Sequence, residues 1–505
     1  MTERRWLVSV IVLLALILMY REFNHPLPLQ ASETDAPPNV INGYTGNNVR
    51  EGAIGGTISG GGKIGFPNLV TGDFGTIGGG LGNETATQAV VGGGYNNTTT
   101  AYRATIGGGV ANLATGGSST IGGGERNTTN FAFSTVGGGS FNTADGLSAT
   151  VSGGTANIAG GERSTVGGGT QNAASGLEST VSGGIRNAAS NAYAAIGGGI
   201  SNQASGRRAT IAGGAGNVAA GEDAAIGGGL SNQATDPYST VAGGRANRAG
   251  SANDTAEDAR YATVGGGQDN VAGGLGATVS GGLENTAGGD FAGIAAGSGN
   301  VAAGDYSFAV GRRAQINDSH SGALLLADAT DADFTSEAAN EFAVRATGGV
   351  RLITAVDDTG QPVAGVQLAE GSGAWQTLSD RHAKANIVPV NEQEILTLLM
   401  AVPISSWNYQ TQNAAIRHIG PMAQDFYAAF GVGEDERYLT TVDVDGVTLA
   451  AIQGLYQIVQ SQDNLIADQQ QTIESLMAEN AALSMRLSAL EDRFVSLEQS
   501  LSKIK

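Results

Sequence analysis

The sequence lacks cysteine and has little proline or histidine. Among its 505 residues are 10 prolines and four histidines, which stand far apart at His25, His320, His382 and His418. A chain without cysteine can form neither a disulfide nor a thiolate metal site. Scattered histidines argue against a histidine-rich metal centre. We therefore expect no metal and no other cofactor.

Positive charge is also scarce, and the formal net charge is −20. An acidic chain repels phosphate backbones, so nucleic acid is not expected as a partner. Glycine, in contrast, is abundant, with 81 residues, but it does not follow the Gly-X-Y period of collagen. The length exceeds that of one ordinary domain, so we expect several structural regions.

The N-terminal segment combines basic residues with an apolar run. Arg4 and Arg5 precede fifteen mostly apolar residues from Trp6 to Tyr20. This pattern is typical of a secretion signal, and the run is short for a membrane-spanning helix, which needs about 20 residues. The best candidate cleavage site, ending at Ala31, lies far from the apolar run. Residues 1–31 are predicted to be a signal peptide or an uncleaved membrane anchor, with a buried helix as a third alternative. The first two export the rest of the chain.

After a linker over residues 32–43, one unit repeats along residues 44–328. An isoleucine or valine anchors each unit, and an asparagine follows six residues later. The anchors with an unbroken spacing of fifteen are at positions 106, 121, 136, 151, 166, 181, 196, 211, 226 and 241. Their asparagines are Asn112, Asn127, Asn142, Asn157, Asn172, Asn187, Asn202, Asn217, Asn232 and Asn247. Eight additional residues, around Ser251–Asp254, separate Val241 from Val264 and are expected to form a loop.

A short, fixed period is the signature of a solenoid. Several glycines in each unit exclude a helical repeat, because each costs about 1 kcal/mol in a helix interior. The unit fits one coil of a parallel β-roll, with two short strands and with glycines supplying positive φ at the corners. The anchors would point inward and the asparagines would form a ladder between coils. About seventeen coils, stacked about 4.8 Å apart, predict a rod on the order of 80 Å long.

So thin a roll buries little apolar surface to offset the entropy of ordering each coil. Packing one flank against other copies of the chain would solve this problem. Over most of residues 44–312 the repeat resembles the YadA-like head repeats of trimeric autotransporter adhesins. The resemblance implies a left-handed parallel β-roll that packs as a homotrimer, and it implies no particular ligand.

Other functions of glycine-rich repeats fit less well. A threonine precedes most anchors, as at Thr105 and Thr120, but ice-binding faces usually pair outward threonines and here each has an inward neighbour. Calcium-binding glycine repeats need a regular aspartate, where this repeat has asparagine. The glycine runs also lack the Lys-Ser/Thr of a phosphate-binding loop. A polysaccharide hydrolase needs paired carboxylates, and no acidic pair recurs in the units.

The repeat ends near residue 328, and two regions of mixed composition follow. Residues 329–378 contain two short apolar segments, Phe342–Ala346 and Val350–Ile353, and are predicted to form a neck of strands and turns without chemistry. Residues 379–450 are predicted to form a small α+β domain. Its expected elements are helices at Glu392–Ala401 and Pro421–Phe430 and a strand at Ile404–Tyr409.

Three segments near this domain carry a second resemblance. They are Ser379-Asp380-Arg381-His382-Ala383-Lys384, Arg417-His418-Ile419-Gly420-Pro421-Met422-Ala423-Gln424-Asp425 and Val442-Asp443-Val444-Asp445-Gly446. Together they resemble the C-terminal intramolecular chaperone domain of phage endosialidase tailspikes, serine peptidase family 74, over about residues 379–460. Members of this family trimerise a fibre and then cut themselves off.

The resemblance implies a cut between Leu378 and Ser379. Ser379 would be the nucleophile and Lys384 the base, while His418 is a candidate for orienting or stabilising the reaction. A lysine accepts a proton only in its neutral form, which burial or nearby positive charge favours. Such a serine endopeptidase would act once on its own chain, and no turnover on other substrates is expected.

A heptad repeat begins at Ile452 and occupies most of residues 451–505. Its apolar a and d positions predict a left-handed coiled coil. The a positions are Ile452, Val459, Ile466, Ile473, Asn480, Leu487, Phe494 and Leu501, and the d positions are Leu455, Gln462, Gln469, Leu476, Leu483, Leu490, Leu497 and Ile504. The pattern alone does not decide between two and three strands, but both resemblances favour three.

The predicted fold is therefore mostly β. It is a trimeric left-handed parallel β-roll of 15-residue repeats, followed by a small α+β chaperone domain and a trimeric coiled coil. The predicted function is a secreted or cell-surface adhesin-like fibre whose C-terminal domain is a trimerisation chaperone that cuts before Ser379. The alternatives are an uncleaved adhesin with the C-terminal part as a stalk, and a tailspike-like protein that binds or hydrolyses polysaccharide. A cell-surface or polysaccharide ligand is a candidate partner of the rod, and the sequence leaves open whether the rod binds any ligand.

Overall fold

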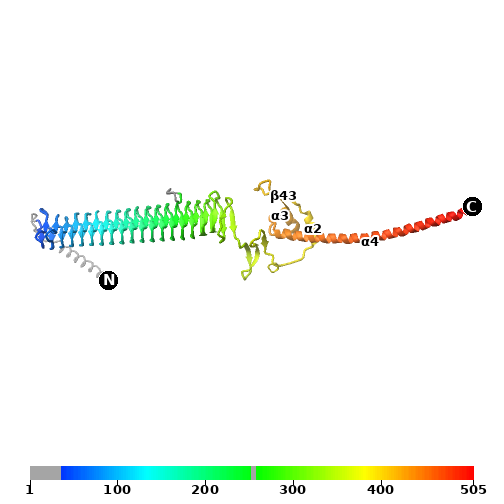
Figure 1. The fold of residues 1–505 in the computed structure, drawn as a ribbon, viewed down its shortest axis with the longest axis horizontal. Coiled ribbons are helices and arrows are strands. Elements are labelled where there is room, and N and C mark those ends of the chain that lie inside the picture. Colours follow the sequence, from blue (N-terminus) through cyan, green and yellow to red (C-terminus); the bar gives the residue numbers. More distant parts are fainter. Residues whose placement is uncertain (1–35, 252–257, 505) are drawn as a thin grey trace, which may run out of the picture. The chain divides into compact units, whose positions relative to one another are not determined.

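A computed structural model describes residues 36–251 and 258–504 (Figure 1). The signal peptide or anchor predicted for residues 1–31 lies outside this range. Within the described residues, no helix has both the length and the apolar character needed to cross a membrane. The chain divides into two units, the first ending at Thr347 and the second starting at Gly348.

The first unit is a β-solenoid built from two ladders of parallel strands. One ladder has 20 strands, from β1 (Val40–Ile41) to β39 (Phe342–Arg345). The other ladder runs from β2 (Asn48–Val49) to β38 (Phe334–Thr335). Each strand pairs with its equivalent in the next coil, as Ile106 of β9 (Thr105–Ile106) pairs with the residue fifteen positions later. The predicted parallel stack of coils is confirmed.

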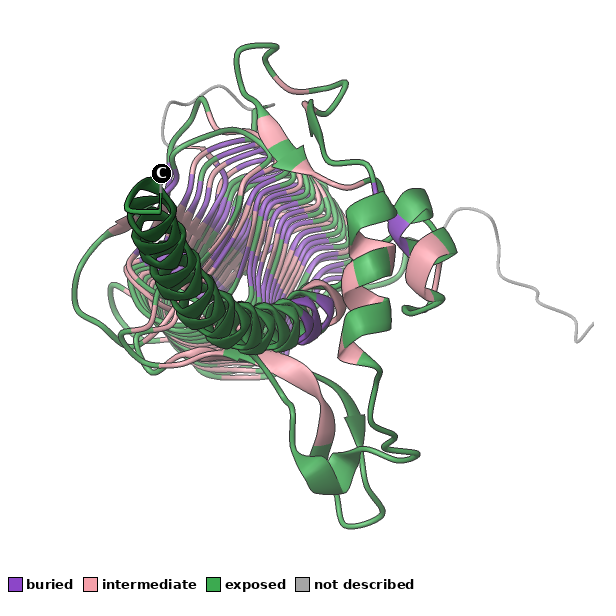
Figure 2. Cartoon of the chain, turned by 90° about the vertical axis from the view of Figure 1, so that its right-hand side faces the viewer, coloured by how far each residue is buried: buried purple, intermediate pink, exposed green. Residues whose placement is uncertain are grey.

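The core of each coil is small because two-residue strands place one side chain inside and one outside. Ile106 of β9 and Ala114 of β10 (Leu113–Ala114) are fully buried, while their neighbours Thr105 and Leu113 face outward. Ala104, which precedes β9, is also fully buried. Figure 2 shows these buried positions as continuous rows inside the solenoid. An alanine facing an isoleucine keeps the two ladders close together.

The predicted asparagine column is present and fully hydrogen-bonded. The backbone N–H of Asn127 donates to Asn112 Oδ1 at 2.9 Å. Asn112 Nδ2 donates to the carbonyl of Gly108 in its own coil at 3.0 Å and to that of Gly124 in the next coil at 2.9 Å. Direct amide-to-amide bonds are the exception, as between Asn112 Nδ2 and Asn97 Oδ1 at 3.0 Å. The column therefore joins side chains mainly to backbone, so these buried amides are satisfied.

The expectation that glycine supplies positive φ at the corners is correct at one corner only. Gly109 has φ of +98°, and a Cβ there would lie 2.1 Å from the Gly124 carbonyl oxygen, so no other residue fits. Two other rows with positive φ contain mostly non-glycine residues, such as Arg103 at +57° and Ala111 at +56°. This conformation costs a non-glycine residue about 1–2 kcal/mol. Backbone bonds to the preceding coil offset the cost, as from Ala111 N to Tyr95 O at 2.8 Å.

The ladders continue past the extra residues that follow Val241. Val241 pairs in parallel with Val264 of β29 (Thr263–Val264), although the intervening coil is longer than the others. The asparagine column also continues, because Asn270 N donates to Asn247 Oδ1 at 3.0 Å across a sequence separation of 23. The predicted loop falls mainly on residues 252–257, outside the described residues.

The solenoid ends later than the predicted boundary at residue 328. Leu324 of β37 (Leu324–Ala327) pairs in parallel with Phe342 of β39, so part of the predicted neck, residues 329–378, belongs to the solenoid. The asparagine column stops earlier, at Asn300, whose side-chain oxygen accepts a last bond from Ala314 N at 2.9 Å. The side-chain pattern is therefore lost before the backbone pairing ends.

A partly buried ion pair closes the last coil. Arg345 Nε donates to Asp328 Oδ1 at 2.9 Å, and a second guanidinium nitrogen donates to the Arg312 carbonyl at 2.8 Å. The backbone N–H and the hydroxyl of Thr347 both donate to Asp328 Oδ2 at 2.7 Å. These two bonds, the backbone one first, hold the pKa of Asp328 well below its usual range.

The second unit begins with a three-stranded antiparallel sheet and ends with a long helix. Its strands and helices are β40 (Val350–Val356), β41 (Pro362–Leu368), β42 (Trp375–Thr377), the 3₁₀ turn η1 (Arg381–Ala383), α2 (Glu392–Ala401), β43 (Ser405–Trp407), β44 (His418–Gly420), α3 (Ala423–Phe430) and α4 (Thr441–Ser502). The predicted helix and strand segments are all present. α4, however, starts before the predicted boundary at residue 451, because Thr440 caps it by accepting a bond from Asp443 N at 3.2 Å.

α2 packs against the first part of α4 at a glycine. A Cβ on Gly454 would lie 2.4 Å from the Glu392 carbonyl oxygen, so the absence of a side chain permits this close approach. Beyond this contact the apolar heptad positions of α4 face solvent. Leu483 and Leu490, for example, are each 54% exposed. One chain alone therefore leaves the apolar face of α4 uncovered.

Candidate functional site

The predicted nucleophile follows directly after the sheet of the second unit. The N–H of Leu378 donates to the Gly365 carbonyl at 3.0 Å, which extends the β41–β42 ladder by one bond past Thr377. Ser379 is the next residue, and there the chain leaves the sheet. The Leu378–Ser379 peptide bond thus lies where the strand ends.

A single 3₁₀ turn brings the predicted base back to the nucleophile. Asp380 caps η1 by accepting a bond from His382 N at 2.9 Å, and Lys384 N donates to the Arg381 carbonyl at 3.2 Å. This turn places Lys384 Nζ within 2.5 Å of Ser379 Oγ. A nucleophile and a base at hydrogen-bond distance are the minimum for activating a serine hydroxyl. The two predicted catalytic residues therefore lie together, and both are exposed in the single chain.

Asp380 and His382 form the turn rather than a proton relay to the serine. His382 Nδ1 lies 3.1 Å from Asp380 Oδ1, and the His382 side chain is 93% exposed. The backbone N–H of His382, and then its side chain, lower the pKa of Asp380. A charged Asp380 keeps the cap of η1 in place, and with it the approach of Lys384 to Ser379.

His418 lies on β44, paired with Trp407 of β43. Its Nε2 is 2.9 Å from Gln412 Oε1, and its ring centroid is 4.8 Å from that of Trp407. Among the described residues, no hydrogen bond or ring contact joins His418 to Ser379 or Lys384. In the single chain His418 thus packs in its own hairpin, and its supporting role stays a prediction.

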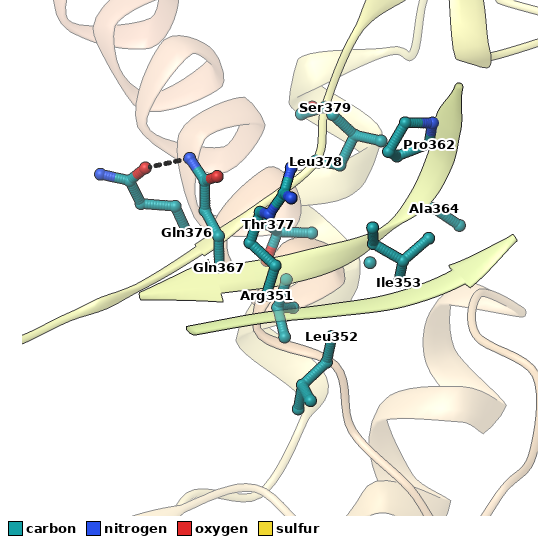
Figure 3. Close-up of a pocket in the computed structure, with 12 residues that line it drawn as sticks. Arg351, Leu352, Ile353, Pro362, Ala364, Gln367, Gln376, Thr377, Leu378 and Ser379 are labelled. Atoms are coloured by element: carbon teal, nitrogen blue, oxygen red, sulfur yellow. Dashed lines mark hydrogen bonds between the residues drawn. The ribbon is translucent and has the colours of Figure 1, made fainter. Parts of the chain in front are cut away.

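Beside the end of β42 lies a hollow of about 250 Å³. Figure 3 shows it, and its lining residues are Arg351, Leu352, Ile353, Pro362, Ala364, Gly365, Val366, Gln367, Gln376, Thr377, Leu378 and Ser379. Most of them come from β40 and β41, within the neck where the sequence predicted no chemistry. Strand pairing alone brings them beside Leu378, and the sequence pattern carries no signal for that register.

Comparison with known families assigns the segment that contains the Ser379–Lys384 pair. Residues 379–432 match the Peptidase_S74 family model, described as chaperone of endosialidase. This segment is an endosialidase chaperone domain. The match includes Ser379, Lys384 and His418 but neither the neck sheet nor α4. No curated protein matches the chain.

The endosialidase chaperone domain thus follows a long parallel β-solenoid in one chain. Its first matched residue, Ser379, is also the first residue after the bond that the sequence predicted to be cut. The Leu378–Ser379 peptide therefore lies at the boundary between the neck sheet and the matched domain.

Proposed function

We propose that this chain is an exported homotrimeric fibre whose C-terminal part, residues 379–505, is an intramolecular chaperone that removes itself. The observation that carries the proposal is the bond between Lys384 Nζ and Ser379 Oγ at 2.5 Å, at the start of the endosialidase chaperone domain. The rod, residues 44–378, would remain as the mature product.

Cleavage proceeds in two steps. The neutral amine of Lys384 takes the Ser379 hydroxyl proton while Oγ attacks the Leu378 carbonyl carbon. The C–N bond then breaks, the Ser379 nitrogen receives the proton from Lys384, and an ester joins Leu378 to Ser379 Oγ. Water hydrolyses this ester to a carboxylate on Leu378 and restores the Ser379 hydroxyl. The reaction consumes one water and needs no cofactor.

Self-association is supported by the exposed apolar face of α4. Its heptad positions need partner helices, and burial of a leucine contributes about 1.5–3 kcal/mol. The same assembly would cover Ser379 and Lys384, which are exposed in the single chain. Burial favours the neutral amine that the reaction requires. Assembly thus serves as the trigger, and the chain is cut only after its copies have come together.

Export and adhesion form the remaining part of the proposal. The basic and apolar segment within residues 1–31 supports export to the cell surface or medium, with or without a retained anchor. The resemblance of the repeat to trimeric adhesin heads supports an adhesin-like role with a left-handed roll. Retention of residues 379–505 as a stalk is the alternative, and the mass of the mature chain distinguishes the two.

The test is expression of the full chain followed by intact mass and N-terminal sequencing. We expect a new N-terminus at Ser379 that forms with first-order kinetics after trimers assemble. Ser379→Ala and Lys384→Ala should stay uncut but trimeric. Lys384→Arg should also stay uncut, because arginine does not lose its proton. Lys503→Ala, at the end of α4, is the matched control and should be cut normally. A wild-type trimer that remains full-length would refute self-removal.

A further inference from the structure

Leu378, the residue before the scissile bond, is held by its N–H only. The N–H of Leu378 is fixed by the Gly365 carbonyl at 3.0 Å, whereas no donor among the described residues reaches the Leu378 carbonyl oxygen. Under the proposed function, on which this inference rests, negative charge develops on that oxygen when Ser379 attacks. Enzymes generally stabilise such charge with positioned donors. The pair of Ser379 and Lys384 supplies none, so the missing donor must come from elsewhere.

The register of the neck sheet brings one arginine to this place. Arg351 of β40 pairs with Gln367 of β41, and Gln367 pairs with Gln376 of β42. The three side chains therefore form one row across the sheet. Leu378 lies two residues after Gln376, and so its side chain is on the same face. Gln367 and Gln376 bond each other at 2.9 Å, which leaves Arg351 as the charged member of the row.

In the next row of the sheet the central residue is a glycine, which leaves space for the side chain of Arg351. Ile353 pairs with Gly365, which in turn holds Leu378, so the central position of this row has no side chain. Gly365 has φ of +146°, and a Cβ there would lie 2.3 Å from the Leu352 carbonyl oxygen. The pairing is irregular just after Ile353, as in a β-bulge. Bulges of this kind commonly re-aim side chains next to active sites.

Arg351 extends into the hollow that this gap leaves. It lines the same space of about 250 Å³ as Leu378 and Ser379. Figure 3 shows its side chain reaching from β40 toward the end of β42. No carboxylate forms an ion pair with Arg351 within the described part of the chain. Arginine stays protonated at any relevant pH, so a permanent positive charge lies beside the scissile bond.

We infer that Arg351 is a further residue of the self-cleavage site. Its guanidinium donates to the Leu378 carbonyl oxygen as the tetrahedral intermediate forms and as the C–N bond then breaks. Arg351 lies outside the matched segment, residues 379–432. After cleavage it remains on the rod while Ser379 and Lys384 leave with the chaperone. The reaction therefore separates its own site into two parts, which explains why each chain is cut once.

The test measures the first-order rate constant of cleavage in assembled protein. Arg351→Ala should slow cleavage about 10²–10³-fold, the usual effect of removing one oxyanion donor. The product should still begin at Ser379, and the trimer should persist. Arg351→Gln keeps the length of the side chain without its charge and should be equally slow. Arg351→Lys keeps the charge but loses the planar fork of donors. Its cleavage rate should therefore lie between those of wild type and Arg351→Ala.

Two further measurements separate a chemical role from a structural one. Added guanidinium, below unfolding concentrations, should speed cleavage of Arg351→Ala and leave wild type unchanged. The pH profile of the variant should keep the wild-type midpoint. If high pH restored the wild-type rate to Arg351→Ala, the arginine would act on the base and the inference would be wrong.

Arg437→Ala is the matched control. Arg437 is paired with Asp435 at 3.0 Å, away from the hollow, and its loss should leave the rate unchanged. Wild-type cleavage together with unchanged rates in Arg351→Ala and Arg351→Gln would overturn the inference and leave the proposed function standing. Failure of both wild type and Arg437→Ala to cut would instead refute the proposed function.

Discussion

The two units of this chain differ in how far a single chain buries their apolar side chains. In the solenoid, Ile106 and Asn112 are buried, and Asn112 bonds to its own coil and to the next one. In α4, Leu483 and Leu490 are more than half exposed, although they occupy apolar heptad positions. The inward side chains of the coils are thus covered within one chain, whereas the apolar heptad positions of the helix are not. Under the proposed function, the C-terminal helix would therefore determine assembly.

This difference explains why a repetitive rod would have a chaperone. Successive coils are nearly identical, so neighbouring rods can associate in many registers that differ by whole coils. Each wrong register forms almost the same contacts as the correct one. A helix with a distinct heptad pattern has one best alignment, and polar a or d residues can fix it. Joining helices first would align the rods before they pack.

Deleting residues 379–505 should have the largest effect. Without the helix and the chaperone domain, the rods should associate out of register and aggregate through their open edges. Sedimentation velocity and soluble yield measure this outcome. Ser379→Ala is the control, since it should keep the C-terminal part attached and the trimer intact. Normal soluble trimers from the truncated chain would show that the solenoid assembles without residues 379–505.

Breaking the asparagine column should be the next largest effect. In Asn172→Leu, the N–H of Asn187 loses its acceptor and the carbonyls of Gly168 and Gly184 lose a donor. The Gly184 carbonyl still accepts a bond from Thr170 N at 2.9 Å. The other two groups are left unsatisfied at a cost of about 1–3 kcal/mol each, so we expect a loss of about 2–6 kcal/mol in the free energy of unfolding. Denaturant unfolding measures the loss. Thr170→Val, on the exposed surface of the same coil, should change little.

Two glycines of α4 provide a smaller and sharper test. Gly454→Ala places a methyl group 2.4 Å from the Glu392 carbonyl oxygen and should weaken the packing of α2 on α4 by about 1–3 kcal/mol. Gly446→Ala meets open space in the same helix and should stabilise it by up to about 1 kcal/mol. Thermal unfolding should therefore shift in opposite directions. Equal shifts would show that α2 does not dock at Gly454.

The smallest expected effect concerns the ion pair that closes the solenoid. Because the folded state lowers the pKa of Asp328, its stabilising contribution is present above the unfolded pKa of about 3.9 and is lost as the pH falls below it. Asp328→Asn should reduce the melting temperature at neutral pH and flatten its decrease in acid. Melting curves of both proteins across this range test the prediction. Parallel pH dependence would exclude Asp328 as the titrating group.

The sequence predicts the solenoid well because every coil repeats the same side-chain demands. The inward anchor, the asparagine and the glycine before it each recur in the sequence at a fixed spacing. The last coils were not predicted, because β37 and β39 pair through backbone bonds after the asparagine column has ended at Asn300. The backbone conformation at the corners was predicted only in part, because non-glycine residues such as Arg103 also adopt positive φ there.

The candidate site was predictable only as far as one short segment determines it. Ser379 and Lys384 lie five residues apart, and one local turn suffices to join them. The position of Arg351 depends instead on the pairing of three strands and on the irregularity near Gly365. No periodic pattern specifies that register. Site residues that are positioned by long-range strand pairing therefore cannot be predicted from a single sequence.

The coil between Val241 and Val264 has a practical consequence. The asparagine bond across it spans 23 residues, where the preceding one spans 15, and both measure 3.0 Å. Extra chain length at this corner therefore leaves the stack undisturbed. The corner between β28 (Arg248–Ala249) and β29 is a ready acceptor for grafted peptides. A reporter or epitope inserted there would be displayed at a fixed height along the rod.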